Sequence, residues 1–404
     1  MPGKAANEKG ADLERRFARA EFAEGSLVRL RHPVTHQISN RRRVITDVDV
    51  LSLDFDARLR PQLGITECKS TRGQAGEQDR LLWLKGMQSL VGADRASLVR
   101  ESVSPAGRDV ARRIGVDLIG GDELARREKV LDHMPDRFAT IGATAFTDQA
   151  AKAAEQLKTI GLRSGLVAFL EQDALLAEPH RVLGALLTLD EATKTGAVVP
   201  MPLASVLAGH SLQALLVAAL RAGGRIDVIG VEGVRREIEQ GLGTGDPHDQ
   251  QLFRVAEMAD TLLNQELADI HRAYRAQGAT VIERQVPSLR QAIAQAPAWL
   301  PRFVDLAERL RRRTPVARQL PQTVDLVVFD ALYDGDAWSA SSFDHLFGRE
   351  HRQLLTVALE CLASALPALA GTLDPVTELP FDRVPTAALR DRTAHAAGYG
   401  VSRS

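Results

Sequence analysis

The sequence predicts an α/β domain in residues 1–130, with helices flanking a mixed sheet, followed by a mainly α-helical region in residues 131–404. Two observations support this prediction. Up to residue 130, short aliphatic runs alternate with amphipathic stretches, as expected when helices cover a sheet. Beyond residue 130, apolar residues recur mostly at helical spacing, and few runs have strand character.

The first part begins with a helical pattern. Leu13, Phe17 and Ala20 lie on one stripe of the stretch 12–23, and Gly25 ends it. A short strand at 27–30 and a polar loop containing Pro33 follow. Two further strands are expected at 44–53 and 63–68, where aliphatic residues are interleaved with polar ones.

The remaining elements of this part alternate regularly. Ser104 suits a helix N-cap and Pro105 the first helical position, which predicts a helix at 105–114. The expected elements after the third strand are a helix at 79–90, a strand at 96–100, the helix at 105–114, a strand at 116–119 and a helix at 122–129.

The second part is expected to be mostly helical, with a further division near 278–320. The helical patterns cover 148–157, 166–174, 181–189, 202–222, 231–240, 247–277, 287–295, 301–313 and 351–366. Two β-branched runs, 225–229 and 324–329, are expected to form strands.

Composition predicts a soluble, cytoplasmic chain. Hydrophobic content of 45% and charged content of 25% are ordinary for a globular protein. The two cysteines, Cys68 and Cys361, fit a reducing compartment, and no signal peptide or membrane span is expected. Residues 1–130 hold 24 Lys and Arg against 19 Asp and Glu, whereas the remainder holds 27 against 33. This modest asymmetry favours a polyanionic partner for the first part only.

The stretch "TECKST" carries the main chemical signal. On a strand, Glu67 and Lys69 share one face, while Cys68 turns to the other. If the preceding strand pairs beside it, Asp49 converges with them. Two close carboxylates favour a cation between them, and Mg²⁺ binds a few carboxylates together with water and phosphate. The alternative is a row of cross-strand ion pairs with no catalytic role.

The first part resembles the PD-(D/E)xK nuclease superfamily, and most of all its Mrr-type restriction endonuclease and archaeal Holliday junction resolvase-like branch. The stretches that carry the resemblance are "GADLERRFARA", "ITDVDVLSL", "GITECKST" and "RASLVRESVSPAGRDVARRIGVDLIGGDEL", within residues 10–128. The resemblance implies a restriction-endonuclease-like fold with a metal site on one face of the sheet. Val48 stands where the superfamily name has proline.

The resemblance also implies roles for individual residues. Asp49 and Glu67 match metal ligands that also take part in catalysis, and Lys69 matches the catalytic lysine. Glu14, in the first helix, matches an additional metal ligand. The alternative for Glu14 is a solvated acid favoured by the helix dipole.

Two further assignments are auxiliary, and a third concerns nucleic-acid binding. Asp47 lies where relatives carry a glutamate, and it is expected to be an auxiliary ligand or a group behind the ligands. Gln88 is the candidate for a glutamine found in the helix after the lysine strand, although an exposed helix residue is the alternative. Arg41, Arg42 and Arg43 precede the aspartate strand and would contact nucleic-acid phosphates, unless they form a solvated loop.

The expected function is therefore Mg²⁺- or Mn²⁺-dependent hydrolysis of phosphodiester bonds in DNA, with RNA as an alternative substrate. Relatives of this architecture serve restriction or anti-phage defence, so the resemblance implies such a setting. The helical region would select the substrate, form a homodimer or bind a partner protein. The alternative is a non-cleaving DNA-binding or scaffold component of a larger complex.

Overall fold

The structure is a computed structural model. It describes residues 2–38, 41–70, 76–131, 138, 140–141, 152–153, 155–157, 159–160, 162, 164–245, 251–280, 287–294, 296–331 and 335–382. The side chains of residues 2–8, 36–38, 41–43, 164, 253, 291 and 294 fall outside this description. Half of the helix expected at 148–157, namely residues 148–151 and 154, also lies outside the described residues.

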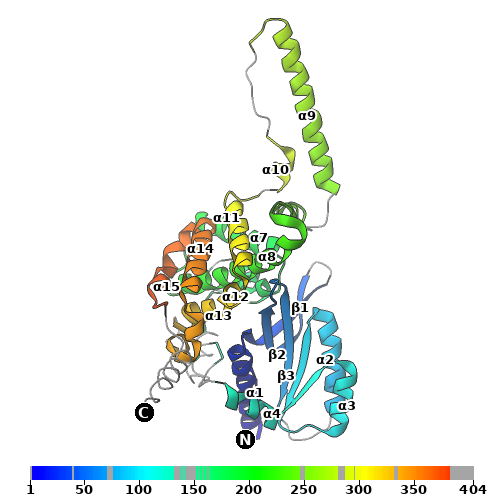
Figure 1. The fold of residues 1–404 in the computed structure, drawn as a ribbon, viewed down its shortest axis with the longest axis vertical. Coiled ribbons are helices and arrows are strands. Elements are labelled where there is room, and N and C mark those ends of the chain that lie inside the picture. The colour runs from blue at the N-terminus through cyan, green and yellow to red at the C-terminus, as the bar shows by residue number, and fades with distance from the viewer. Residues whose placement is uncertain are drawn as a thin grey trace, which may run out of the picture.

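The N-terminal region is built on a five-stranded mixed sheet with the strand order β1-β2-β3-β4-β5 (Figure 1). The strands are β1 (Leu27–Ile38), β2 (Arg41–Phe55), β3 (Pro61–Lys69), β4 (Arg95–Arg100) and β5 (Asp117–Gly120). The first three strands pair antiparallel, whereas β4 is parallel to both β3 and β5. The α/β class and the mixed sheet expected for this region are confirmed.

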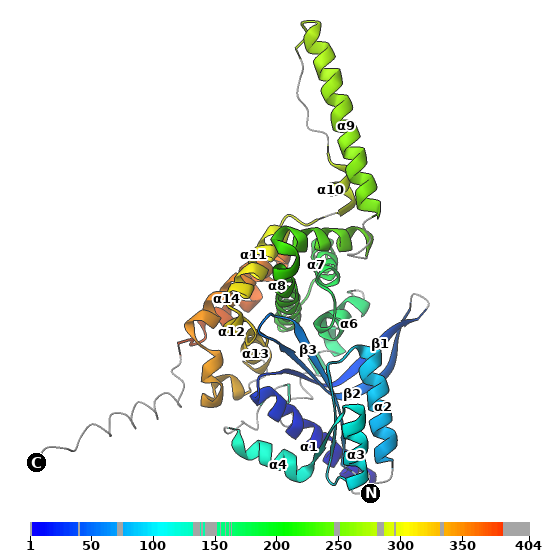
Figure 2. The ribbon, with the colours of Figure 1, turned by 45° about the vertical axis from the view of Figure 1, so that its right-hand side comes forward.

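Helices cover both faces of the sheet (Figure 2). They are α1 (Pro2–Ala23), α2 (Glu77–Val91), α3 (Pro105–Ile114) and α4 (Gly121–Val130). The apolar side chains of α2 and α3 share a core with Leu51 and Ile65 of the sheet. Those of α1 and α4 share a core with Val50 and Cys68, on the opposite face.

Local sequence signals explain several element boundaries. Ser104 caps α3 as expected, since its hydroxyl accepts a hydrogen bond of 2.8 Å from the Gly107 amide. The first strand, by contrast, runs past Pro33 to Ile38, where a polar loop was expected. Because β1 is an edge strand, the missing amide hydrogen of Pro33 costs the sheet little there.

The second region is helical, as expected. Its α-helices are α6 (Ser164–Glu171), α7 (Pro179–Lys194), α8 (Leu203–Thr244), α9 (Gln251–Ala276), α10 (Leu289–Ala294), α11 (Leu300–Arg312), α12 (Thr314–Ala317), α13 (Leu320–Val324), α14 (Arg349–Ala365) and α15 (Asp374–Glu378). Short 3-10 helices are η1 (Asp173–Leu175), η3 (Ala337–Ser339), η4 (Ser341–Leu346) and η5 (Pro367–Leu373), and η2 (Asp325–Asp330) is π-helical.

Helix α8 forms the centre of this region. It is long and apolar enough to cross a membrane, but 94% of its apolar window is buried inside the protein. It therefore packs as the core helix of this region. Gly230, with φ of 72°, kinks it.

Both predictions of a strand in the helical region are wrong. Residues 225–229 belong to α8, and residues 324–329 form the end of α13 and most of the π-helical segment η2. In both places β-branched residues suggested a strand. Residues 324–329 are buried on all sides, and such an apolar run has no periodicity that separates strand from helix.

The two regions share one hydrophobic core, which extends from Leu13 to Phe381. Buried polar contacts also join them. The Gln322 side-chain amide donates to the Phe22 carbonyl at 2.5 Å, and Arg29 of β1 lies 2.8 Å from the fully buried Asp325 carboxylate. Residue 130 therefore marks a change in secondary structure within a continuous core.

Helix α9 projects away from the rest of the molecule (Figures 1 and 2). Seven of its large apolar side chains are exposed, namely Leu252, Val255, Met258, Leu262, Leu263, Ile270 and Tyr274. An exposed apolar face of this kind is typical of a protein interaction surface.

Candidate active site

The candidate site lies where β2 and β3 stop pairing. Their last paired residues are Val50 and Thr66. Beyond this point the Cys68 amide has lost its partner on β2, and the Asp49 carboxylate takes that place. Asp49 Oδ2 accepts a hydrogen bond of 2.7 Å from the Cys68 amide. The separation of the strands therefore brings a carboxylate between them.

Three charged side chains meet at this point. Lys69 Nζ lies 2.6 Å from Glu67 Oε1 and 3.8 Å from Asp49 Oδ2. The Glu67 side chain is only 6% exposed, whereas that of Lys69 is 33% exposed. The expected convergence of Asp49, Glu67 and Lys69 is therefore present in the structure.

The site places a buried acid beside a second acid. Burial, and then the charge of Asp49, raises the pKa of Glu67 above its usual value, while Lys69 opposes that rise. Two adjacent carboxylates of this kind are stabilised by a cation between them, and the Lys69 ammonium group supplies one.

Cys68 turns to the other face of the sheet, as expected. It is 4% exposed and packs into the core beside α1. Burial raises the pKa of its thiol well above the usual value, and the charges of Asp49 and Glu14 act in the same direction. Cys68 therefore acts as an apolar core residue.

Glu14 does not contact the carboxylate pair in the structure, and its assignment as a metal ligand stays a prediction. Its Oε2 lies 3.0 Å from Arg31 Nε, on the neighbouring strand β1. The physical reason is that α1 covers the Cys68 face of the sheet, whereas Glu67 is on the α2 face. Within the part of the chain that the structure describes, no three His, Cys, Asp or Glu side chains form a ligand group.

Asp47 is also separate from the site. It is exposed and lies opposite Pro33 of β1. The regular alternation that would align Asp47 with Asp49 is broken between them, because Val48 and Val50 pack into the cores on opposite faces. The break lies beside Arg31, which has a positive φ of 50°.

Gln88 lies at the opposite end of β3 from the candidate site. Its amide donates to the Asp94 carbonyl at 3.1 Å, and the Asp94 amide in turn donates to the Leu63 carbonyl near the start of β3. Six residues of strand separate Leu63 from Lys69, which is about 20 Å. The expected auxiliary role of Gln88 is therefore contradicted, and its side chain stabilises the turn between α2 and β4.

The basic triplet Arg41–Arg43 starts strand β2, where a loop was expected. Its backbone pairs with residues 36–38 of β1. The triplet is six or more residues from Asp49, which is about 20 Å along the strand. It therefore does not border the carboxylates, and the nucleic-acid contact assigned to these arginines stays a prediction.

Arg80 is a site residue that the sequence reasoning missed. It lies in the first turn of α2, and its Nη1 is 3.6 Å from Glu67 Oε1. The signal that could have found it is its position in the sequence. The first turn of a helix that follows a parallel strand lies at the carboxyl end of that strand, where Lys69 is found.

The donor set fits a hard divalent cation. The Lys69 ammonium group lies 2.6 Å from a Glu67 oxygen and 3.8 Å from an Asp49 oxygen, so both carboxylates face the same cationic group. Mg²⁺ needs only one or two protein carboxylates, because water and substrate phosphate complete its coordination. Asp49 and Glu67 would be its protein ligands, and their charges would then no longer depend on Lys69.

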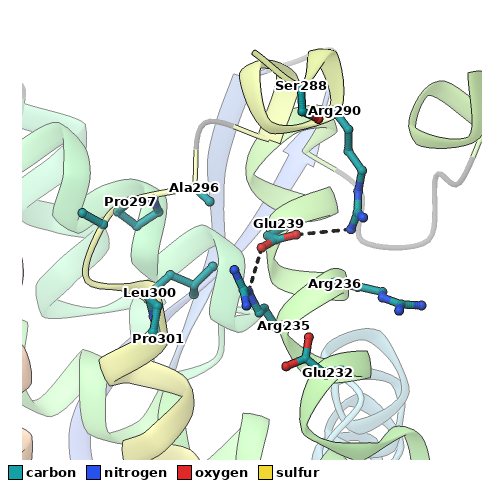
Figure 3. Close-up of a pocket in the computed structure, with 11 residues that line it drawn as sticks. Glu232, Arg235, Arg236, Glu239, Ser288, Arg290, Ala296, Pro297, Leu300 and Pro301 are labelled. Atoms are coloured by element: carbon teal, nitrogen blue, oxygen red, sulfur yellow. Dashed lines mark hydrogen bonds and ion pairs between the residues drawn. The ribbon is translucent and has the colours of Figure 1, made fainter. Parts of the chain in front are cut away.

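A polar pocket lies elsewhere in the chain, between α8, α10 and residues 296–301 (Figure 3). In it the Glu239 carboxylate bridges Arg235, at 3.0 Å, and Arg290, at 3.3 Å. This ionic contact joins α10 to α8. None of the residues expected to be functional lines the pocket.

No family model, no curated protein and no solved structure matches the chain.

Proposed function

We propose that this chain is a metal-dependent nuclease with a restriction-endonuclease-like N-terminal fold, and that it hydrolyses phosphodiester bonds in DNA. The observation that carries the proposal is the convergence of two carboxylates and one ammonium group where β2 and β3 separate. A surface ion pair needs only one acid and one base. Here a second acid is added beside a buried one, which raises the energy of the site in the absence of a cation.

The roles follow from position and chemistry. Asp49 and Glu67 would hold Mg²⁺ or Mn²⁺, which when bound polarises a phosphoryl oxygen and lowers the pKa of water at the site. Asp49 is held in place by its hydrogen bond from the Cys68 amide. Lys69, released from the carboxylates, would orient the attacking water and stabilise charge that develops on the phosphate.

A cleavage assay tests this proposal. Supercoiled plasmid, linear duplex DNA and single-stranded RNA would each be incubated with the chain and Mg²⁺, Mn²⁺ or chelator. We expect cleavage of DNA with either ion and none with chelator. Lys69→Ala should lower the rate at least about a hundredfold, in keeping with the loss of a group that positions or transfers a proton.

Lys85→Ala is the matched control. Lys85 lies on α2, where its ammonium group contacts Gln88 at 2.9 Å, so its loss should leave cleavage unchanged. Cleavage that survives both Lys69→Ala and Glu67→Gln would come from a contaminant or another site, and the proposal would fail.

The second candidate is a non-cleaving component of a larger complex. The exposed apolar side chains of α9 favour it, because a projecting helix of this kind suits a protein partner or a second copy of the chain. The cleavage assay separates the two candidates. Failure to cleave every nucleic acid with either ion would favour the scaffold.

A further inference from the structure

Arg80 faces the candidate site from the first turn of α2. Its guanidinium group is 3.6 Å from the Glu67 oxygen that also contacts Lys69, yet 48% of its side chain is exposed. The guanidinium carbon lies 5.7 Å from the centre of the Trp83 ring, which supports the side chain from one side. Arg80 thus touches the site and remains open to a ligand.

The first turn of α2 is held firmly. Glu77 is 2% exposed, and its Oε1 accepts a hydrogen bond of 2.6 Å from the Ser104 hydroxyl at the start of α3. Its other oxygen lies 3.9 Å from Arg100, which is paired with Lys69 in the sheet. Gly107 is required nearby, since a Cβ at that position would overlap the Glu77 carboxylate. These contacts fix the backbone from which Arg80 extends.

The balance of charges at the site indicates which kind of group Arg80 would contact if a metal were bound. Without metal, the two carboxylates of Asp49 and Glu67 face two cations, Lys69 and Arg80. A divalent ion would neutralise the carboxylates. Lys69 and Arg80 would then lose their anionic partners and present two positive charges beside the metal. A nucleic-acid backbone supplies the negative charge that they would need.

We propose that Arg80 binds a backbone phosphate next to the phosphodiester bond that is cleaved. This inference rests on the proposed nuclease function. A guanidinium group suits the task because its planar array of donors binds phosphate through two hydrogen bonds. Such a contact reads no base, so it contributes affinity and register for any sequence.

Binding and cleavage measured on variants test the role. A duplex of mixed sequence would be titrated in Ca²⁺ over a range of salt concentrations, and cleavage would be followed in Mg²⁺. Removing one phosphate contact should lower the slope of log K against log salt by about 0.9. We expect this loss in Arg80→Ala, with a raised KM and a largely unchanged kcat, because the contact exists before and during the reaction.

Two other variants sharpen the test. Arg80→Lys keeps the charge but loses the paired donors, so it should keep the salt slope and bind with intermediate affinity. Arg112→Ala is the matched control, since Arg112 is 81% exposed and lies in the last turn of α3, the end remote from Ser104. It should resemble the wild type.

The outcomes separate the two proposals. Cleavage that requires metal and Lys69, combined with the same salt slope for Arg80→Ala and Arg112→Ala, would overturn the role of Arg80 and leave the nuclease in place. Absence of metal-dependent cleavage in the wild type would overturn both.

Discussion

The hydrogen bond between Asp49 and the Cys68 amide predicts a difference between two substitutions. Asp49→Ala removes the acceptor, whereas Asp49→Asn keeps an oxygen that can accept the same bond. Both substitutions remove the charge beside Lys69 and Glu67, so those effects cancel when the two variants are compared. The comparison isolates the structural role of Asp49 at the point where the strands separate.

The magnitude follows from the geometry. The bond is 2.7 Å long, and Cys68 is 4% exposed, so water has little access to the freed amide. An unsatisfied buried amide costs about 1–3 kcal/mol, and a neutral hydrogen bond recovers roughly 1 kcal/mol of stability. We therefore expect the free energy of unfolding of Asp49→Ala to be about 1–2 kcal/mol below that of Asp49→Asn.

Urea denaturation followed by circular dichroism would measure this difference, and the plasmid assay would measure activity. Neither variant should show metal-dependent cleavage, since both lack a carboxylate at position 49. Equal stability of the two variants would refute the reasoning, because it would mean that the Cys68 amide gains nothing from residue 49. Retained cleavage in either variant would refute the assignment of Asp49 as a metal ligand.

Further predictions concern pH, the helix end and the buried ion pair. Burial and the charge of Asp49 raise the pKa of Glu67, so the folded chain keeps the Glu67 carboxyl proton to a higher pH than the unfolded chain does. The free energy of unfolding should therefore fall as pH rises through the raised pKa. Urea unfolding at a series of pH values would measure this fall, and Glu67→Gln should remove it. Gln88→Ala should leave plasmid cleavage unchanged, and reduced cleavage would restore its auxiliary role. Arg29→Ala should cost about 3–5 kcal/mol in denaturation by leaving Asp325 buried without its cation, and a loss below about 1 kcal/mol would contradict this.

The sequence was sufficient to predict the local elements of the N-terminal sheet. Alternating aliphatic residues defined β2 and β3, and Ser104 with Pro105 defined the start of α3. These signals depend on neighbours within a few residues, so they are visible without the fold. The pairing of Glu67 with Lys69 on one face has the same origin, since it depends only on the two-residue period of a strand.

Assignments that depend on distant contacts were not settled by the sequence. Glu14 was placed with the metal ligands, but the sequence does not state that α1 covers the opposite face and that Arg31 holds its carboxylate. Gln88 was placed in the site, but a helix rises about 1.5 Å per residue, so its position eight residues beyond Arg80 carries it about 12 Å away. The fully buried run 324–329 gave no period to distinguish a strand from a helix.

By itself, then, the sequence determined the element types of the N-terminal region and the one triplet whose chemistry suggests catalysis. Only the tertiary structure decided that β2 and β3 separate after Val50 and Thr66, which turns Asp49 toward Cys68 and Lys69. It also decided that Arg80, and not Gln88, completes the charges at that point. The physical reason is that strand period and helix caps are local properties, whereas the position where a sheet opens depends on the packing of its two faces.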